Sequence, residues 1–276
     1  MPSPCRIFGR LRRRRADSVG RSPTASGKTV TIDCFPERAK HYRHADAIVA
    51  VDVIRATTTV VTAAVLGRSC FVVPTIDEAF ALADRLRDPL LVGEVSGEMP
   101  DGFHLHNSPA AIATRTDIQR PMILVSTSGT RLIVEAEAAE AVYVACLRNL
   151  TAQASYVAAH HSAVVLLGAG SRGEFRDEDQ LCCAWIAQEL VRAGYTPTDD
   201  TTRAVIERWD GVPVDAVERG ASAAYLRRTG QHHDLEFITA HVNDLTAVYR
   251  SSRGRIERAG APRHDEPGRG TAVADV

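Results

Sequence analysis

Reactive side chains follow two apolar runs of the sequence, and a helical pattern follows each of them. The first run ends at Val51 and is followed by Asp52, Arg55, Thr57 and Thr58. The free N–H groups and the dipole of a helix N-terminus attract phosphate, and an arginine can bind it with two hydrogen bonds. This segment therefore predicts an anion site beside a cation site. The alternative is structural: Thr57 caps the helix, and Asp52 pairs with Arg55.

A second segment repeats this arrangement, with a hydroxyl-rich glycine turn between an apolar run and a helix. The residues that could bind a ligand here are Thr127, Ser128, Gly129, Thr130 and Arg131. Taken alone, the segment is typical of an ordinary capped turn. Two such turns in one sheet favour a shared site, because ligands of open parallel sheets bind outside the carboxyl ends of the strands.

A long loop between residues 93 and 109 adds carboxylate and amide groups. It contains Glu94, Asn107 and Ser108, and long loops in compact domains are often functional. The loop therefore predicts further site residues. The alternative is a solvated loop in which Ser108 and Pro109 begin a short helix.

Glu178 and Asp179 lie in an acidic cluster at the start of a helical pattern. Together with Asp52 they predict a Mg²⁺ site, because Mg²⁺ prefers a few carboxylates together with waters and substrate oxygens. The alternative is that these acids only stabilise the positive end of the helix dipole.

The segment from Gly168 to Gly173 matches the GxGxxG pattern that binds dinucleotides when it follows a strand. However, it lies deep in the chain, and acidic residues follow where a pyrophosphate would lie. Such sites also have a second strand that ends in an acidic residue about 20 residues later, and the sequence shows no such strand there. The segment is therefore a weak indication of a nucleotide site.

Short apolar runs alternate with helical patterns, which predicts a layered α/β fold with a largely parallel sheet. The expected strands are Thr29–Phe35, Ala47–Ile54, Cys70–Pro74, Leu90–Val95, Met122–Thr127, Ala141–Cys146 and Ala163–Gly168. The expected helices are Thr57–Leu66, Asp77–Arg87, Thr130–Ala138, Asn149–His160 and Glu178–Ala193. From residue 198 onward the pattern predicts helices only, and therefore a helix-rich C-terminal part.

The two ends of the chain differ in composition from its body. Residues 1–28 hold seven arginines, one lysine and one aspartate, a sum of +7, so the net charge of −1 leaves −8 on the rest. We expect a disordered basic leader at 1–28, one domain at 29–250 with a helical subregion at 198–240, and a disordered tail at 251–276. The acidic body argues against a nucleic-acid partner. The alternative for the leader is a tether to an anionic surface.

The composition also excludes several classes of protein. With 45% hydrophobic residues in 276, the chain is neither disordered nor a small disulfide scaffold. No apolar run approaches the roughly 20 residues needed to cross a bilayer, so we expect no membrane partner. Six scattered cysteines without a CxxC pair indicate reduced thiols and a cytoplasmic protein. A homo-oligomer is left open.

The motifs, in their order, resemble the 2-phosphosulfolactate phosphatase family over roughly residues 30–248. The segments that carry the resemblance are Val51–Thr59, Gly93-Glu94, Gly102-Phe103, Asn107-Ser108-Pro109, Gly129-Thr130-Arg131, Asn149, Ala169-Gly170 and Glu178-Asp179. The resemblance implies a Mg²⁺-dependent phosphatase that converts 2-phospho-3-sulfolactate to 3-sulfolactate and phosphate, in coenzyme M or sulfolactate biosynthesis. Two residues depart from the family pattern: His106 stands where glycine is usual, and Ser128 where asparagine is usual.

These considerations assign roles to the candidate residues. The expected catalytic residues are Asp52, Arg55, Glu94 and Asn149, and the expected Mg²⁺ ligands are Asp52, Glu178 and Asp179. The expected substrate-binding residues are Thr57, Thr58, Asn107, Ser108, Thr127, Ser128, Gly129, Thr130 and Arg131. Arg131 or Arg148 would pair with the sulfonate or carboxylate of a small phosphorylated acid. Two rival functions stay open: a non-catalytic anion-binding or regulatory protein with this fold, and a nucleotide-dependent enzyme that uses Gly168–Gly173.

Overall fold

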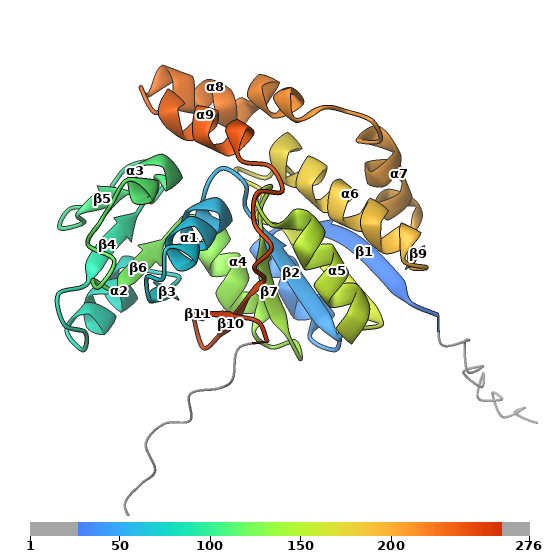
Figure 1. Ribbon diagram of the computed structural model, residues 1–276, viewed down its shortest axis with the longest axis horizontal. Coiled ribbons are helices and arrows are strands. Elements are labelled where there is room, and N and C mark those ends of the chain that lie inside the picture. Colours follow the sequence, from blue (N-terminus) through green and yellow to red (C-terminus); the bar gives the residue numbers. More distant parts are fainter. Residues whose placement is uncertain (1–26, 261–276) are drawn as a thin grey trace, which may run out of the picture.

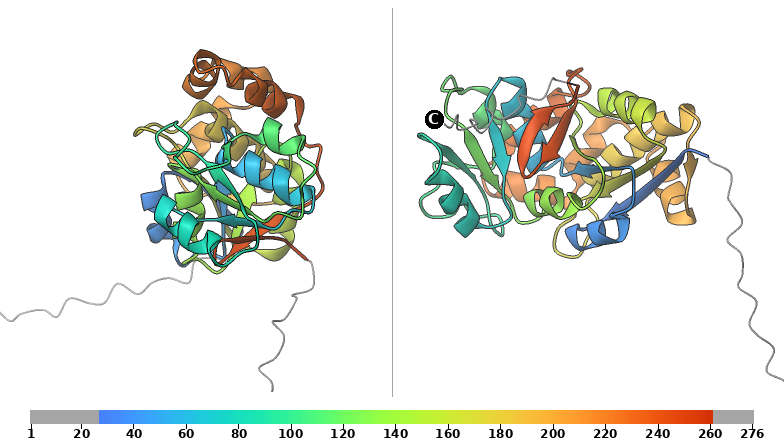
Figure 2. Two further views of the ribbon diagram at one scale, coloured as in Figure 1. Left: turned by 90° about the vertical axis from the view of Figure 1, so that its left-hand side faces the viewer. Right: turned by 90° about the horizontal axis from the view of Figure 1, so that it is seen from below.

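The computed structural model describes residues 27–260, in which helices cover both faces of a mixed β-sheet (Figures 1 and 2). The strands are β1 (Thr29–Cys34), β2 (Ala47–Val51), β3 (Cys70–Val72), β4 (Leu90–Gly93), β5 (Leu105–His106), β6 (Met122–Val125), β7 (Val142–Ala145), β8 (Ala163–Gly168), β9 (Thr196–Pro197), β10 (Tyr249–Ser252) and β11 (Arg255–Arg258). The α-helices are α1 (Ala56–Val65), α2 (Ile76–Ala83), α3 (Pro109–Ala113), α4 (Gly129–Ala136), α5 (Leu150–His160), α6 (Asp177–Arg192), α7 (Asp200–Arg208), α8 (Ala221–Arg228) and α9 (His232–Ala240), and the 3₁₀ helices are η1 (Pro36–Tyr42) and η2 (Val214–Arg219). No helix within residues 27–260 combines the length and the apolar character needed to cross a membrane.

The strand order across the sheet is β5-β4-β6-β3-β11-β10-β7-β2-β8-β1-β9. Every neighbouring pair is parallel except the pairs made by β10 and β11. The predicted α/β fold with a largely parallel sheet is therefore confirmed. The parallel strands form two groups, β5-β4-β6-β3 and β7-β2-β8-β1-β9, and the three successive antiparallel pairings between them give the groups opposite senses in the strand order. The segments that follow β2, β4, β6 and β8 nevertheless line one cavity, and we call the place where they meet the carboxyl edge of the sheet.

Alternate residues of β2 pack into two separate hydrophobic cores. Ala47, Val49 and Val51 face the core that α5 and α6 cover. Ile48 and Ala50 face the opposite core, which α1 and α4 cover. This arrangement explains the uninterrupted apolar run in the sequence, because a parallel strand covered on both faces needs apolar side chains on both.

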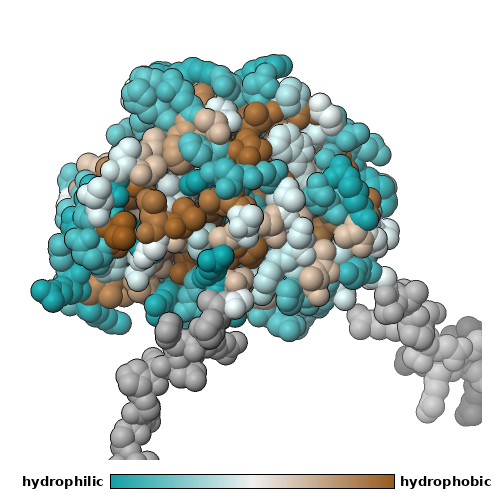
Figure 3. Space-filling model, viewed as in Figure 1, coloured by the Kyte–Doolittle hydropathy of each residue, from teal (hydrophilic) through white to brown (hydrophobic). Residues whose placement is uncertain are grey.

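The helices after residue 198 form a layer beyond the carboxyl edge of the sheet. We call residues 221–240, which contain α8 and α9, the cap; Figure 1 shows it above that edge. Leu226, Leu235 and Ile238 of the cap are buried in the same core as α6. The outer surface of the cap is mainly hydrophilic (Figure 3), as expected of helices that bury one face.

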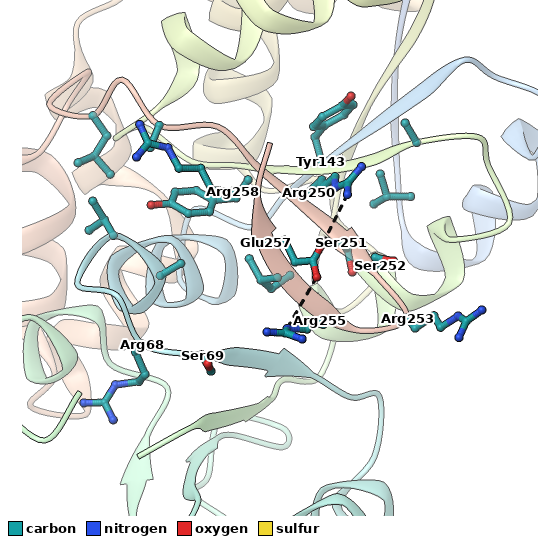
Figure 4. Close-up of a pocket in the computed structure, with 18 of the residues that line it drawn as sticks. Arg68, Ser69, Tyr143, Arg250, Ser251, Ser252, Arg253, Arg255, Glu257 and Arg258 are labelled. Carbon is teal, nitrogen blue, oxygen red and sulfur yellow. Dashed lines mark hydrogen bonds and ion pairs between the residues drawn. The ribbon is translucent and has the colours of Figure 1, made fainter. Parts of the chain in front are cut away.

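The expected disordered tail is wrong for residues 251–260. β10 and β11 form a hairpin whose turn residues, Arg253 and Gly254, both have positive φ angles, as a two-residue type I′ turn requires. The hairpin pairs with β7 on one side and β3 on the other, and so joins two halves of the sheet. Figure 4 shows Glu257 between Arg250 and Arg255 on this hairpin. Residues 261–276 lie outside the described part of the chain.

The domain also begins earlier than predicted. Lys28 donates a hydrogen bond from Nζ to the carbonyl oxygen of Ala158 at 2.7 Å. Its own carbonyl oxygen accepts a hydrogen bond from the N–H of Thr196 at 2.9 Å. Lys28 therefore belongs to the domain and not to the leader, of which residues 1–26 lie outside the described part.

Candidate active site

A cavity of about 670 Å³ lies between the carboxyl edge of the sheet and the cap. The turns that follow β2, β4, β6 and β8 form one side of it, and α8 forms the other. The predicted residues that line it are Asp52, Arg55, Glu94, Asn107, Thr127, Ser128, Gly170 and Asp179. Polar groups from several strand ends thus share one cleft, as expected for an open parallel sheet.

Asp52 follows directly after β2, and its side chain is almost completely buried. Its Oδ1 accepts a hydrogen bond from the backbone N–H of Ala56 at 3.2 Å. Burial and the nearby charge of Glu94 raise the pKa of Asp52 to about 7. The raised pKa means that this environment disfavours the charged carboxylate, and a cation bound nearby would favour it.

Arg55 is buried and its guanidinium reaches the cap. Nη1 donates hydrogen bonds to Asp234 Oδ2 and to Gln231 Oε1, both at 2.6 Å, and Nη2 donates to His106 Nδ1 at 3.0 Å. The alternative that Arg55 pairs with Asp52 is therefore wrong. A guanidinium carries five N–H donors, so the Nε hydrogen and one Nη2 hydrogen are left for a ligand in the cavity.

His106, one of the two residues that depart from the family pattern, holds Arg55 in place. Its Nδ1 accepts from Arg55, and its Nε2 lies 3.1 Å from the carbonyl oxygen of Gly97. Burial and the charge of Arg55 lower the pKa of His106, which favours the neutral ring that this pair of bonds requires. The same carbonyl oxygen accepts a hydrogen bond from Tyr225 Oη at 2.8 Å. His106 therefore ties the arginine to the loop after β4 and to the cap.

Asp179 lies in the first turn of α6, and two backbone groups hold its carboxylate. Oδ1 accepts from the N–H of Val53 at 2.8 Å, and Oδ2 accepts from the N–H of Gly170 at 3.2 Å. Burial, with the charges of Asp52 and Glu178, raises the pKa of Asp179 well above its usual value. Asp179 is therefore the residue of the acidic cluster at 177–179 that lines the cavity, and backbone groups fix its carboxylate there.

Glu178 is almost fully buried but does not line the cavity. Its Oε2 has no hydrogen-bond partner within residues 27–260, and burial raises its pKa. The Oδ1 of Asn107, which does line the cavity, is also buried without a partner in that range. Of these two oxygens only that of Asn107 lies at the cavity, where a water or a bound cation would satisfy it.

Glu94 lines the cavity and ties two loops together. Its carboxylate accepts hydrogen bonds from the N–H and Oγ1 of Thr127, at 2.8 and 2.9 Å, and from the N–H of Gly97, at 2.7 Å. Thr127 Oγ1 in turn accepts from the N–H of Ser96 at 2.7 Å. Glu94 and Thr127 thus hold two loops of the cavity wall together, and these hydrogen bonds occupy much of their capacity to bind a ligand.

Gly129 allows the start of α4 to approach Asp52 closely. A Cβ atom at this position would lie 2.1 Å from Asp52 Oδ2 and 2.6 Å from the Cβ of Ala56. Real Cβ atoms do not approach other atoms so closely, so only glycine fits without moving the backbone. Gly129 therefore acts through its lack of a side chain.

Three threonine hydroxyls that we expected to bind substrate hold the local backbone instead. Thr57 and Thr58 donate to the carbonyl oxygens of Asp52 and Val53, both at 2.8 Å. Thr130 donates to the carbonyl oxygen four residues earlier at 3.0 Å. All three side chains are buried and none lines the cavity. They stabilise the tight turns from strand to helix. Thr57 does not cap α1 as the structural alternative had it, because Arg55 is the N-cap residue and its side chain makes no capping hydrogen bond.

Ser108 and Asn149 also lie away from the cavity. Ser108 Oγ caps α3 by accepting from the N–H of Ala111, and donates to Asp234 Oδ1 at 2.6 Å. Asn149 is fully buried, and its Oδ1 accepts from the N–H of Cys146 at 3.0 Å. The predicted contact of Asn149 with substrate is therefore not found, because its amide closes the turn after β7.

The two arginines proposed to pair with a second anionic group are bonded elsewhere. Arg131 lies in the first turn of α4, half exposed, and pairs with Glu37 at 2.8 Å and Glu135 at 2.6 Å. Arg148 pairs with Asp244 at 2.6 Å. Neither lines the cavity.

Three other arginines, which sequence reasoning missed, line the cavity. Arg172 and Arg176 reach the cavity from the loop after β8, and Arg228 reaches it from the end of α8. The GxGxxG segment drew attention to the loop that contains Arg172 but not to this arginine. No local pattern marks Arg228, because only the packing of the cap brings it to the sheet edge.

The loop from Gly168 to Gly173 does not form a phosphate-binding turn of the nucleotide type. The N–H of Gly170, which a phosphate would need, donates to Asp179. Ser171 and Glu174 close the loop on itself through backbone hydrogen bonds of 2.9 and 3.0 Å. The acidic partner favours a cation at this point over a pyrophosphate.

Two other features could compete for the role of functional site. A hollow of about 1280 Å³ lies along β10 and β11 (Figure 4), but it contains none of the predicted site residues. The second feature is a group of exposed side chains that could hold a metal ion: His232, His233 and Glu236. Within the described chain, this is the one group of at least three His, Cys, Asp or Glu residues whose ligand atoms all lie within 4.8 Å of one another. The carboxylates at the cavity are therefore more widely spaced than a compact ligand set.

The cavity is lined both by carboxylates, which we call the acidic floor, and by guanidinium groups. The floor carries Asp52 and Asp179, with Glu94 beside them, and Arg55 offers donors to an anion. A site with this division of charge can hold a cation and a phosphate together, and can stabilise the negative charge that develops during phosphoryl transfer.

Comparisons with known proteins agree with this chemistry. The family model described as 2-phosphosulpholactate phosphatase matches residues 34–252. A protein of Symbiobacterium thermophilum named probable 2-phosphosulfolactate phosphatase is 32% identical over 216 residues, which cover 75% of this chain and 92% of that protein. Proteins of the same name from Clostridium perfringens and Pseudothermotoga lettingae are 28% identical over 76% of this chain and 87% of theirs, and 39% identical over 51% of this chain and 61% of theirs. The chain therefore belongs to the 2-phosphosulpholactate phosphatase family.

Proposed function

We propose that this protein is a Mg²⁺-dependent phosphatase that hydrolyses 2-phospho-3-sulfolactate to 3-sulfolactate and phosphate. The observation that carries the proposal is the cavity lined both by Arg55 and by the buried carboxylates of Asp52 and Asp179. The family match supports the reaction class, and the names of the relatives support the substrate.

The residues at the cavity fit a divalent cation. Asp52 and Asp179 are the candidate ligands, because both line the cavity and both are carboxylates with raised pKa values. Mg²⁺ needs only one or two protein carboxylates, since waters and substrate oxygens complete its shell. Asn107 offers a further oxygen that has no hydrogen-bond partner within residues 27–260, whereas Glu178 does not line the cavity. When bound, Mg²⁺ would neutralise charge on the phosphoryl oxygens.

The protein itself supplies orientation and positive potential. Arg55 would donate its two free N–H groups to phosphoryl oxygens, with its position set by Asp234, Gln231 and His106. Hydrolysis forms a bond from phosphorus to a water oxygen and breaks the bond to the C2 oxygen, which leaves as the hydroxyl of 3-sulfolactate. A guanidinium that is already in place stabilises this transition state without a reorganisation cost.

The test is phosphate release from 2-phospho-3-sulfolactate with Mg²⁺ and with EDTA, on the wild type and two neighbouring variants. Asp179→Asn should lose activity together with the Mg²⁺-induced rise in melting temperature. Asp177→Asn should keep both, because Asp177 pairs with Arg208 and does not line the cavity. Full activity in EDTA would remove the metal from the proposal, and no phosphate release under any condition would overturn the function.

A further inference from the structure

Three arginines on the wall of the cavity have no part in the hydrolysis described above. Arg172 and Arg176 come from the loop after β8, whereas Arg228 comes from the last turn of α8 on the opposite wall. Two segments that are far apart in the sequence therefore both place guanidinium groups at one cavity. Their chemistry indicates a ligand with an anionic group besides the phosphate.

Each of these guanidinium groups has N–H donors without a carboxylate partner within residues 27–260. Arg172 and Arg228 form no ion pair with a carboxylate of residues 27–260, and Arg228 lies over the ring of Tyr225, 5.5 Å from its centroid. Arg176 pairs with Glu174 at 2.6 Å, but its Nε is buried and has no hydrogen-bond partner in the same range. By contrast, Arg227, next to Arg228 on α8, pairs with Glu218 at 2.8 Å and lies outside the cavity.

The proposed substrate carries two anionic groups besides the phosphate. In 2-phospho-3-sulfolactate the carboxylate and the phosphate group are attached to C2, whereas the sulfonate is attached to C3. With the phosphoryl group at Arg55 and the acidic floor, the sulfonate is the anionic group most remote from the reacting phosphorus. A sulfonate stays ionised at neutral pH and presents three oxygens, which arginine forks bind well.

We propose that Arg172, Arg176 and Arg228 form a subsite that binds the sulfonate of the substrate. The inference rests on the proposed function and deepens it, because it assigns the recognition of the sulfonate to residues outside the family motifs found in the sequence. The subsite also offsets the acidic floor, which would otherwise repel a substrate with several negative charges.

The test compares two substrates and a matched pair of variants. Arg228→Ala and Arg172→Ala should each lower kcat/KM for 2-phospho-3-sulfolactate by roughly tenfold, the loss expected for one charge-assisted hydrogen bond. The loss should lie mainly in KM, because the sulfonate does not react. Activity on 2-phospholactate, which has a methyl group in place of the sulfonate-bearing carbon, should not change. Arg227→Ala should behave as the wild type with both substrates.

A calorimetric titration with 3-sulfolactate tests the subsite independently of the proposed phosphatase activity. If the wild type hydrolyses neither substrate but binds 3-sulfolactate, and Arg228→Ala loses that binding while Arg227→Ala keeps it, the subsite stands and the phosphatase does not. If the wild type is active and the variants Arg228→Ala and Arg172→Ala keep its preference for the sulfonated substrate, the subsite is overturned and the phosphatase stands. A wild type that neither hydrolyses nor binds overturns both. Melting temperatures near that of the wild type will show that the variants fold.

Discussion

Removal of the Arg55 guanidinium should cost stability as well as activity, because it leaves the carboxylate of Asp234 buried without its cation. Both side chains are only 4% exposed, and their ion pair is 2.6 Å long. Breaking a buried pair by deleting one partner costs about 3–5 kcal/mol. Asp234 keeps hydrogen bonds from Ser108 Oγ and the N–H of Ala110. We therefore expect the free energy of unfolding of Arg55→Ala to fall by about 3 kcal/mol, the lower end of this range.

A second substitution separates the effect on stability from the effect on catalysis. In Arg55→Ala/Asp234→Asn the uncompensated charge is gone, so most of the lost free energy of unfolding should return. Turnover should not return, because the donors to the phosphoryl group are still missing. Loss of such donors lowers turnover on the order of a hundredfold to a thousandfold. Arg55→Lys should also be poor, since lysine keeps the charge but not the fork.

The assays are urea denaturation followed by circular dichroism and phosphate release at saturating Mg²⁺. Arg203→Ala serves as the control, because its exposed pair with Asp200 should contribute less than about 1 kcal/mol. Wild-type turnover in Arg55→Ala would remove this arginine from the active site. Recovery of turnover in the double variant would show that Arg55 acts only by neutralising Asp234.

Three further predictions follow from other parts of the structure. Hydrogen bonds from Arg115 keep the pKa of Asp117 well below its usual value, so the resulting stabilisation is present above about pH 4 and lost as the pH falls. Asp117→Asn should therefore flatten the decline in the free energy of unfolding between about pH 6 and about pH 3. An equal decline in the variant and the wild type would contradict this assignment. Gly129→Ala should lower the melting temperature and abolish phosphate release, because its Cβ would lie 2.1 Å from an Asp52 oxygen; an active variant with an unchanged melting temperature would show that the turn can move at little cost. A chain that ends after residue 248 should lose cooperative thermal unfolding, because it lacks the hairpin between β3 and β7, whereas a chain that ends after residue 260 should melt like the wild type; equal melting of the two truncations would refute the structural role of the hairpin.

Local pattern was sufficient to predict the parallel strands and the strand ends that line the cavity. Continuous apolar runs such as that of β2 mark strands covered on both faces, and their alternation with helical patterns predicts parallel strands. The strand ends were expected to gather Asp52, Glu94, Thr127, Asn149 and Gly170 around one cleft, and all of these except Asn149 line the cavity. Strand ends were the weaker part: we expected β2 to continue to Ile54, but it stops at Val51, where the chain turns into α1.

Side-chain direction and long-range pairing could be decided only by the tertiary structure. The sequence shows a hydroxyl at Thr57 and Thr58 but not that both turn inward to backbone carbonyls. It shows charged residues in 249–258 but not the hairpin, because its strands are held by partners far away in the chain and bury only alternate side chains. The same holds for Arg228, which reaches the cavity because the apolar face of the cap packs on the core beneath it. Periodicity reports which face of an element is buried, whereas the partners of a polar side chain depend on which elements meet in space.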